Sequence, residues 1–498
     1  MAIGSVSTTH VSGGLGNSFP YEDKVHAKIG QAEGYDANKP ILISTYGQGK
    51  DVFVQGELVD ALKQHFEEFN EEAGEIPVPV LCIRPENDQP GSVDPAVPGE
   101  ENAGLADLPT VEGSPTGSRV VVLKITKAGA LGTAEYRKSE NGGESFGPPV
   151  ITPSTGIIAL AVGVTATFAN DTTTPADTFK VGDTFTFNIK GPTASAAKRL
   201  VAIEVLKTID QGNNPFYWFH HIGGVNRAFA VSVSVLLEEM RTQNLFRIFG
   251  VLETERKQTA ETVESYFLRM QDEWDSYENE RVAVIGAEGR YIPGGTDSQG
   301  GWNASLELAD SIGEWRNAAT FLCARLAASR VNESAAWVAK NKSRTFIGIR
   351  YWTEGYKNYL GALDDLGLTM LKIYPDWQGV YIASDNLMAP STSDFQNIPE
   401  LRRANKMHRI VYRGSLPFLK MDTETNSGSG GLDAIKAEVD KKVSEEMERP
   451  GEAEISGHEI IFGTIKKVGQ KKILPATMKM KIKDRLDTIQ WTTEFVLG

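Results

Sequence analysis

The chain has 498 residues, enough for roughly two to four domains and for a core that needs no disulfide or metal to hold it together. Hydrophobic residues make up 40% of the chain and charged residues 23%, which is ordinary usage for a globular protein. The formal net charge is -14, which disfavours nonspecific binding to nucleic acid or to an anionic membrane. We therefore expect neither nucleic-acid partners nor membrane insertion.

No stretch of about eighteen consecutive apolar residues is present, so no membrane-spanning helix is predicted. The first residues lack the basic flank and apolar block of a secretory signal, and we expect the chain to fold in the cytoplasm. The two cysteines, Cys82 and Cys323, lie far apart in the sequence. Two distant cysteines are typical of buried free thiols in a reducing compartment, and they exclude a CxxC zinc or redox site.

The N-terminal part begins with an arm and continues into an α/β pattern. Residues 1–20 are small, polar and rich in glycine, and we expect an extended arm there. Apolar runs at 41–45 and 78–83 predict two strands, and helical spacing from Leu58 to Phe69 predicts a helix between them. This strand–helix–strand order indicates an α/β layer.

Residues 85–118 are rich in Pro, Gly, Asp and Glu, which predicts a long loop. The sequence then becomes β-like, with short β-branched runs between turn residues and a hairpin signal at Asn141-Gly142-Gly143. Strands are predicted at 120–126, 164–168 and 183–189. We interpret residues 117–192 as a small all-β module inserted into the α/β domain.

Patterns of the α/β type return after the module. Helices are predicted from residue 195 onward and over 225–240, 263–277 and 303–330, the last around Leu308, Ile312, Trp315 and Phe321. Strands are predicted at 216–222 and 282–289. We therefore expect residues 21–116 and 193–370 to form one α/β domain that the β module splits.

The C-terminal part, residues 371–498, is predicted to be an α+β domain. The predicted elements are two strands around a turn at 371–390, a mixed helical and extended stretch at 402–419, a helix at 431–449, and extended segments at 458–465, 471–483 and 486–498. The charged face of the helix fits a contact surface and a solvated face equally well. Exposed terminal strands are natural donors to a neighbour's sheet, which suggests a polymer.

Two patterns invite a search for an active site, and neither completes one. Residues 47–50, GQGK, are not a phosphate loop, because that loop needs Ser or Thr after its lysine and Asp51 follows here. His220 and His221 would point to opposite faces of a strand and cannot hold one metal ion together. We interpret these histidines as part of a partly buried aromatic strand.

No nucleophile with a partner base is evident either. The sequence has no GxSxG elbow, and both cysteines stand in apolar segments, where a thiolate is disfavoured. Adjacent carboxylates such as Glu238 and Glu239 fit solvated helix faces. We therefore expect no catalytic, cofactor or metal site, and we interpret the chain as a structural protein.

The segment GVYIASDNLMAP (379–390), followed by IPELRRANKMHRIVYRGSLPFL (398–419), resembles the C-terminal domain of contractile tail sheath proteins, where a strand pair precedes an arginine-bearing helix. GTAEYRKSENGGESFGPP (132–149) and VGDTFTFNIKGP (181–192) look like the insertion in a divergent branch of phage sheath-like proteins. The resemblance covers essentially the whole chain, and its motifs are architectural.

This resemblance implies a virion structural protein of a contractile tail or contractile injection system. Subunits would stack in hexameric rings around an inner tube, alongside baseplate and tail terminator proteins, and contraction would drive the tube through a target envelope. Terminal strands of two neighbours, here about residues 3–20 and 486–498, would complete a sheet in the C-terminal domain of a third. The implied strand-arm residues are Ile3, Val6, Val11, Leu486, Ile489, Trp491, Phe495 and Val496.

The resemblance also implies that a helix of the C-terminal domain faces the tube and that the β module faces outward. Our candidate is the helix over 431–449, and its candidate contact residues are Lys436, Glu438, Lys441, Lys442 and Glu445.

Other interpretations stay open. A tube or baseplate protein is one, although tube proteins are usually much shorter and mostly β. An α/β enzyme with a β accessory domain is another, and it would need an acid–base pair near the carboxyl ends of strands, which the sequence does not show. An adhesin would rest on the β module alone and leaves the α/β part unexplained.

Overall fold

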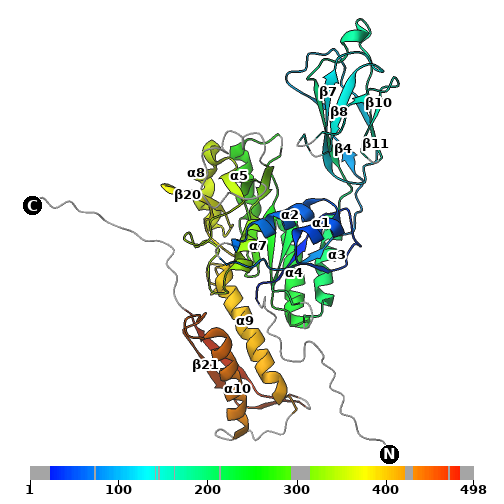
Figure 1. The fold of residues 1–498 in the computed structure, drawn as a ribbon. Helices are drawn as coiled ribbons and strands as arrows, with labels where there is room; N and C mark the ends of the chain where they lie inside the picture. The colour runs from blue at the N-terminus through cyan, green and yellow to red at the C-terminus, as the bar shows by residue number, and fades with distance from the viewer. Residues whose placement is uncertain are drawn as a thin grey trace, which may run out of the picture.

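Figure 1 shows the computed structural model of the chain, in which a β module, an α/β body and a C-terminal unit follow one another. The structure describes residues 23–482 except 72–73, 141, 144–145, 162, 212–214, 259, 293–313, 421–429 and 469–470.

A six-stranded sheet forms the centre of the α/β body, with the strand order β15-β14-β13-β1-β3-β2. Its strands are β1 (His26–Ile29), β2 (Ile41–Ile43), β3 (Val80–Ile83), β13 (Trp218–Val225), β14 (Phe249–Thr254) and β15 (Val282–Ile285). All neighbours run parallel except β2, which pairs antiparallel with β3. β1, β3, β14 and β15 are buried along their length, as is usual for a parallel sheet covered on both faces.

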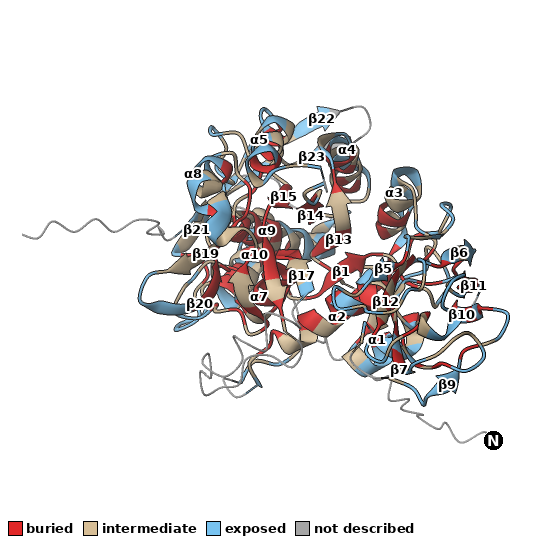
Figure 2. Cartoon of the chain, turned by 90° about the horizontal axis from the view of Figure 1, so that it is seen from above, coloured by how far each residue is buried: buried red, intermediate tan, exposed pale blue. Residues whose placement is uncertain are grey.

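Helices cover the two faces of this sheet, and buried residues concentrate between the layers (Figure 2). On one face, α2 (Glu57–Glu67) and α7 (Ala319–Ala328) pack on each other and on β13. On the other, α3 (Ala196–Glu204) contacts β1 and α4 (Arg227–Gln243) contacts β14. The body also contains α1 (Tyr46–Phe53), α5 (Val263–Trp274) and α8 (Lys357–Asp365).

The sequence analysis missed β1, which lies in the middle of the sheet. His26 and Lys28 interrupt the apolar run that would have predicted a strand there. Both residues are 0% exposed. Lys28 has a buried polar partner in His220, whereas the ring of His26 stacks on that of Trp218.

The β module has two sheets and its own core. Its strands are β4 (Ser92–Val93), β5 (Val97–Pro98), β6 (Thr110–Gly113), β7 (Arg119–Lys127), β8 (Glu135–Ser139), β9 (Val150–Ile151), β10 (Ile157–Ala161), β11 (Val164–Thr167) and β12 (Thr184–Lys190). One sheet has the order β4-β12-β7-β8-β9, with β5 also on β12, and the other has the order β10-β11-β6. Phe168, Phe179 and Phe185 meet edge to face in the core between them.

The three strands predicted for the module are confirmed as β7, β11 and β12. The segment interpreted as a loop before Arg119 instead contributes β4, β5 and β6, which are too short to show a strand pattern in the sequence. The chain enters and leaves the module at one point, where Gln89 and Thr193 form an antiparallel bridge. The two backbone N–H···O distances of that bridge are 2.9 and 3.0 Å.

The helix predicted over 303–330 is wrong in its described first part. Trp315 stands in a strand, β17 (Glu314–Asn317), which joins β16 (Glu288–Tyr291) and β18 (Phe346–Ile349) in the order β17-β16-β18. The helix itself, α7, begins at Ala319 and buries Phe321. Leu308 and Ile312 lie outside the described residues. A four-residue strand next to a helix carries too little periodicity to be separated from it.

The C-terminal part contains β19 (Leu371–Tyr374), β20 (Trp377–Ile382), α9 (Ile398–Ser415), α10 (Gly430–Met447), β21 (Gly457–Phe462), β22 (Lys466–Val468), β23 (Lys471–Ile473) and β24 (Ala476–Lys481). The stretch predicted as mixed is helical in α9, which starts with a capping box between Asn397 and Glu400. The extended segment predicted at 486–498 lies outside the described residues.

The predicted fold class, mixed α/β with several sheets, is confirmed. The predicted domain limits at residues 21–116, 117–192, 193–370 and 371–498 stay a prediction. Within the part of the chain that the structure covers, no helix is both long and apolar enough to span a bilayer.

Candidate functional site

The C-terminal unit contains two long helices, the two-stranded sheet of β21 and β24, and the hairpin of β22 and β23. α9 and α10 pack along each other, and Met407 and Ile410 of α9 meet Val439, Val443 and Met447 of α10 in a small core. This core is separate from that of the α/β body, so the unit has a hydrophobic centre of its own.

The sheet of this unit has open edges. β21 and β24 pair antiparallel over six residues, from Gly457 opposite Lys481 to Phe462 opposite Ala476. Neither strand has a further strand partner within the described chain. A two-stranded sheet is marginal by itself, and unpaired edges accept additional strands. The unit therefore offers two sheet edges for β-augmentation.

An apolar groove of 570 Å³ runs between this sheet and the two helices. Its walls include Met407, Val439, Ile460, Met478 and Met480. The last described residue, Ile482, also lines the groove and is 40% exposed. The groove therefore offers apolar surface beside the open sheet edges.

The strand-arm residues implied by the resemblance lie outside the described residues. They are Ile3, Val6, Val11, Leu486, Ile489, Trp491, Phe495 and Val496. Their pairing with a neighbouring subunit stays a prediction.

The candidate tube-facing helix is α10, and its charges are largely compensated within the helix. Lys436, Lys441 and Glu445 are exposed, whereas Glu438 and Lys442 are half-buried. The ammonium of Lys442 lies 3.6 Å from the carboxylate of Glu438, and that of Lys441 lies 4.0 Å from Glu445. Exposed pairs one turn apart contribute only about 0.3–0.5 kcal/mol each. The tube-facing role of these residues stays a prediction.

A histidine that the sequence analysis did not single out ties α10 to the sheet. His458 of β21 lies 3.0 Å from Asp440 and 2.8 Å from Glu448, one carboxylate on each ring nitrogen. Burial opposes the imidazolium charge, but the two carboxylates more than offset this and raise the pKa of His458. Asp440 lies on α10 and Glu448 directly follows its last residue, so His458 contacts the C-terminal half of the helix and the residue after it.

The centre of the α/β body contains a buried polar row that the sequence analysis also missed. The ammonium of Lys28 lies 3.0 Å from Nδ1 of His220, and Nε2 of His220 lies 2.9 Å from the Glu253 carboxylate. The other oxygen of Glu253 accepts a 3.0 Å hydrogen bond from the N–H of Gly223. The row thus joins β1, β13 and β14, side by side in the sheet.

Burial governs the ionisation of this row. Desolvation lowers the pKa of Lys28, lowers that of His220 well below its ordinary value, and raises that of Glu253 to about 7. A carboxyl and an imidazole with such values suit proton transfer. Lys28 and His220 are 0% exposed and Glu253 is 9% exposed, so the row lies almost wholly inside the sheet and links three of its strands.

His220 and His221 point to opposite faces of β13, as predicted. His220 faces Lys28, whereas the ring of His221 packs 4.9 Å from that of Phe229 in α4. The expectation that this strand is only partly buried is wrong, because the two histidines are 0% and 1% exposed. The signal that sequence reasoning passed over is a Lys, a His and a Glu each standing in an otherwise apolar strand.

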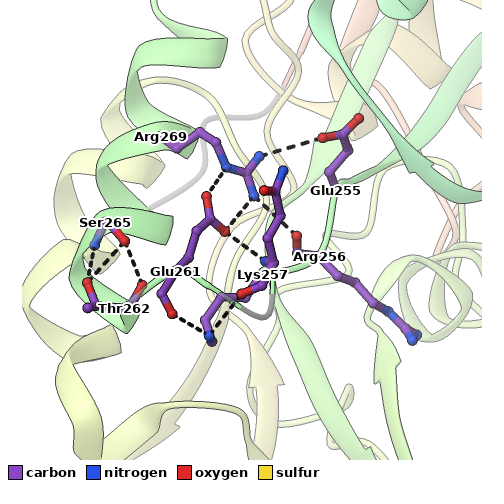
Figure 3. Close-up of polar contacts among 8 residues, drawn as sticks. Glu255, Arg256, Lys257, Glu261, Thr262, Ser265 and Arg269 are labelled. Carbon is purple, nitrogen blue, oxygen red and sulfur yellow. Dashed lines mark hydrogen bonds and ion pairs between the residues drawn. The ribbon is translucent and has the colours of Figure 1, made fainter. Parts of the chain in front are cut away.

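Figure 3 shows the loop that follows β14 at the carboxyl edge of the sheet. The Glu261 carboxylate accepts hydrogen bonds of 2.5 and 3.1 Å from Arg269, whose guanidinium also donates to the carbonyl of Arg256 at 3.1 Å. The ammonium of Lys257 donates to the carbonyl of Glu261 at 2.6 Å. Loops at this edge carry the active site in many α/β enzymes. Here the charged groups are used to hold the loop itself.

The remaining candidate motifs are structural. Residues 47–50 lie inside α1, whose first turn is capped by Thr45. Cys82 and Cys323 are buried free thiols, as predicted, and burial raises the pKa of Cys323 to about 11. Across the residues that the structure describes, no group of three His, Cys, Asp or Glu side chains is arranged to hold a metal ion.

Comparison with solved structures finds similar chains over almost the whole length of this chain. The sheath of an extracellular contractile injection system, the PVC sheath complex in its contracted state, matches with a TM-score of 0.52 and 8% identity over 95% of this chain and 91% of that chain. The contracted helical sheath of the anti-feeding prophage gives a TM-score of 0.48 at 9% identity, covering 95% and 94%. A sheath tail protein from Desulfitobacterium hafniense gives 0.47 at 12% identity, covering 96% and 100%. The likeness to the PVC sheath shows that the chain has a sheath-type fold.

No curated protein matches the sequence. A family model described as the N-terminal domain of DUF2586 matches residues 3–386, which is more than half of the chain. The chain therefore belongs to the DUF2586 family.

Proposed function

We propose that this protein is the structural subunit of a contractile tail sheath. In this proposal the subunits polymerise as stacked hexameric rings around an inner tube and contract to drive the tube through a target envelope. The observation that carries the proposal is the likeness of 95% of this chain to the sheath of a contractile injection system. That likeness includes the C-terminal unit and is therefore not limited to a common α/β core.

The polar groups of the body favour a structural role over a catalytic one. Lys28 and His220, which have the pKa shifts typical of a catalytic group, are enclosed between strands and helices. The charged loop after β14 is engaged in holding its own backbone. In this proposal these groups stabilise the α/β body, and the contacts between subunits are made by other parts of the chain.

Polymerisation in this proposal works by strand exchange. Residues 3–20 of one neighbour and 486–498 of another add to the open edges of β21 and β24 and place apolar side chains against the groove. Each added strand satisfies a row of backbone N–H and C=O groups and covers apolar surface. A completed sheet of four strands is stable where an isolated pair is marginal.

Contraction in this proposal is a change of lattice that leaves the strand links intact. The extended sheath is metastable, and contraction gains contacts between subunits as rigid bodies rotate about their links. The partners are copies of the chain, the inner tube protein, which α10 would face, and the baseplate and tail terminator proteins. The particle would assemble in the cytoplasm of the host cell, with the β module outward.

Deletion of residues 486–498 tests this function. We expect the truncated chain to stay folded, because it keeps the cores of the α/β body, the β module and the C-terminal unit. We expect it to form no tubes, because one strand link per subunit is lost. Circular dichroism reports the fold and negative-stain electron microscopy reports the tubes. A matched control keeps the length and replaces Thr492 and Thr493 by serine, which leaves the apolar positions of the arm unchanged. Tubes formed by the truncated chain would show that strand exchange is not the link.

A further inference from the structure

The C-terminal sheet has a basic surface in an otherwise acidic chain. Residues 457–482 contain six lysines and one glutamate, whereas the whole chain has a net charge of -14. We call β22, β23 and the outer face of β24 the lysine hairpin; the lysine side chains that the structure describes there are Lys466, Lys467, Lys479 and Lys481.

Little within the described chain compensates this charge. The side chains of Lys466, Lys467, Lys479 and Lys481 are exposed. The ammonium of Lys479 lies 3.3 Å from Glu459, the single glutamate of the segment. The other three exposed lysines form no ion pair with a described residue.

The lysine hairpin has little support from the rest of the described chain. β22 and β23 pair with each other and with no further described strand, and a lone two-stranded hairpin is marginal. A binding partner that supplies carboxylates would pair with the exposed lysines and stabilise the hairpin.

The same chain has a surface of the required chemistry. Residues 272–280 contain five carboxylates and no lysine or arginine. We call the exposed carboxylates at the C-terminal ends of α5 and α8 the acidic ridge; they are Asp272, Asp275, Glu278 and Asp365. None of them forms an ion pair with a described residue.

A hollow in the acidic ridge suits a lysine side chain. The helices α5 and α8 pack against each other, and a shallow depression of 340 Å³ lies between their ends. Its wall combines the carboxylates of Asp272 and Asp275 with the apolar side chains of Ala362 and Leu366. An ammonium on an aliphatic stem matches both features, since the stem contacts apolar surface while the charge meets a carboxylate.

The two surfaces lie at different ends of one molecule. Figure 1 shows α5 and α8 on the side of the α/β body away from the C-terminal unit, which follows α9 at the opposite end. A contact between the surfaces must therefore join two copies. It is heterologous, because different patches meet. A heterologous contact generates a ring if its rotation closes and a helical polymer if it does not.

We propose that the lysine hairpin of one copy docks on the acidic ridge of the next copy. This inference deepens the proposed function, because it supplies a contact between subunits that is independent of the terminal strands. The contact is electrostatic and lies on the surface, so it weakens as salt rises through the physiological range.

Charge reversal on each surface, alone and together, tests the proposal. The hairpin variant is K466E/K467E, the ridge variant is D272K/D275K, and the third variant combines all four changes. We expect each separate variant to assemble at least tenfold less well than the unmodified full-length chain, judged by the concentration needed for association. We expect the combined variant to recover, because the reversed surfaces attract again. Sedimentation velocity at several salt concentrations gives the measurement, and thermal melting confirms that each variant is folded.

A matched control distinguishes loss of this contact from a general effect of the changed net charge. K50E/K124E makes the same charge change at two exposed lysines outside the hairpin and should leave association unchanged. If K466E/K467E associates as well as the unmodified chain, the hairpin is not a contact. If the hairpin variant fails and the combined variant does not recover, the ridge is not the surface that the hairpin contacts, and the proposal is rejected.

Failure of the proposed function gives a different result. In that case the unmodified chain forms no tubes even with a tube protein present. Mixing the hairpin variant with the ridge variant still tests the docking, because hairpin and ridge then match across the two species. Association in the mixture that exceeds association of either variant alone supports the contact, and its absence rejects it.

Discussion

His26 combines a close aromatic contact with two enclosed nitrogen atoms. Its ring stacks on that of Trp218 with centroids 5.1 Å apart and the planes within 1° of parallel. Neither ring nitrogen has a hydrogen-bond partner among the described atoms. Burial lowers the pKa of His26 well below 6.5, and the nearby charges of Lys28, His65 and His220 act in the same direction. The ring is therefore neutral in the folded protein.

A histidine of this kind makes the fold sensitive to acid. The unfolded chain binds a proton at His26 near pH 6.5 and the folded chain does not, so the stabilising difference is present above pH 6.5 and is lost as the pH falls below it. We expect His26→Phe to keep the stacking and to remove this loss. The variant should be more stable than the parent, by up to about 2 kcal/mol more at pH 5 than at pH 7.

Chemical denaturation of both proteins at pH 5, 6, 7 and 8 measures this difference. Glu253 works in the opposite sense, because its pKa is raised to about 7 and the stability it contributes is present at low pH and lost as the pH rises through that value. The substitution leaves Glu253 unchanged, so the comparison isolates His26. An equal stability difference at every pH would show that His26 does not titrate.

At the level of residues, the sequence analysis predicted burial and strand face better than it predicted which side chains contact one another. The buried thiols and the opposite faces of His220 and His221 were predicted correctly, because each follows from local pattern alone. The contacts of His220 with Lys28 and Glu253 join residues 192 and 33 positions away. Such pairing depends on the strand order of the sheet, which one sequence does not determine.

Gly414 sets the distance between the two helices of the C-terminal unit. A Cβ at this position would meet Val439 at 3.1 Å and Lys442 at 3.4 Å. We expect Gly414→Leu to force α10 away from α9 and to destabilise the unit by about 1–3 kcal/mol, while the α/β body stays folded. Hydrogen exchange followed by mass spectrometry should show faster exchange in α9 and α10 alone.

Gly361 provides the matched control for this substitution. It also lies within a helix, α8, but a Cβ there has no neighbour within 4 Å. Gly361→Leu should therefore leave exchange in both regions unchanged or slightly slower, because leucine favours helix over glycine. Equal effects of the two substitutions would mean that the close approach at Gly414 is not what holds α10 in place.

Elements were predicted well where an apolar pattern repeats several times. β7, β12, α4 and α5 each span enough residues for the period to be recognised. β1 was missed because two polar side chains occupy its buried face, and β17 was absorbed into a helix because it has four residues. α9 was predicted as mixed because buried arginines, Arg402 and Arg403, stand where apolar residues are expected.

The whole molecule consists of parts that meet at narrow connections. The β module has its own core, and its two connecting strands are held together by the bridge between Gln89 and Thr193. We expect that replacing residues 90–192 by a two-residue turn leaves the α/β body folded, because a bridge of this kind can be closed by a hairpin turn. Thermal melting and limited proteolysis of the shortened chain check this.

The module should also be dispensable for polymerisation, since the proposed contacts use the C-terminal unit and the acidic ridge. Electron microscopy of the shortened chain should then show tubes of smaller outer diameter. Loss of tubes with a folded body would instead place the module at a contact between subunits. Folding of the shortened chain would also test the predicted limits between the inserted module and the α/β domain.

The candidate site could be predicted only in outline at this scale. Composition and helical spacing located α10 and the final described strands, and the resemblance suggested their use. The open edges of β21 and β24, the groove beside them and the separation of the lysine hairpin from the acidic ridge are properties of chain topology. They follow from which strands pair, and that information is distributed over the whole chain.

The helix α9 joins the α/β body to the C-terminal unit, so a rotation at one end of the helix displaces the other end. Its first turns are fixed in the body, where Arg402 lies over the Trp218 ring at 5.2 Å and donates to the carbonyl of Asp23 at 2.8 Å. Its last turns carry the core of the C-terminal unit. The helix has 18 residues and is about 27 Å long, so a tilt of about 10° at its base moves its tip by about 5 Å. That displacement equals about one spacing between neighbouring strands. In the proposed lattice, a small rotation of the body would therefore shift the strand joint between two subunits by that distance while the joint stays intact.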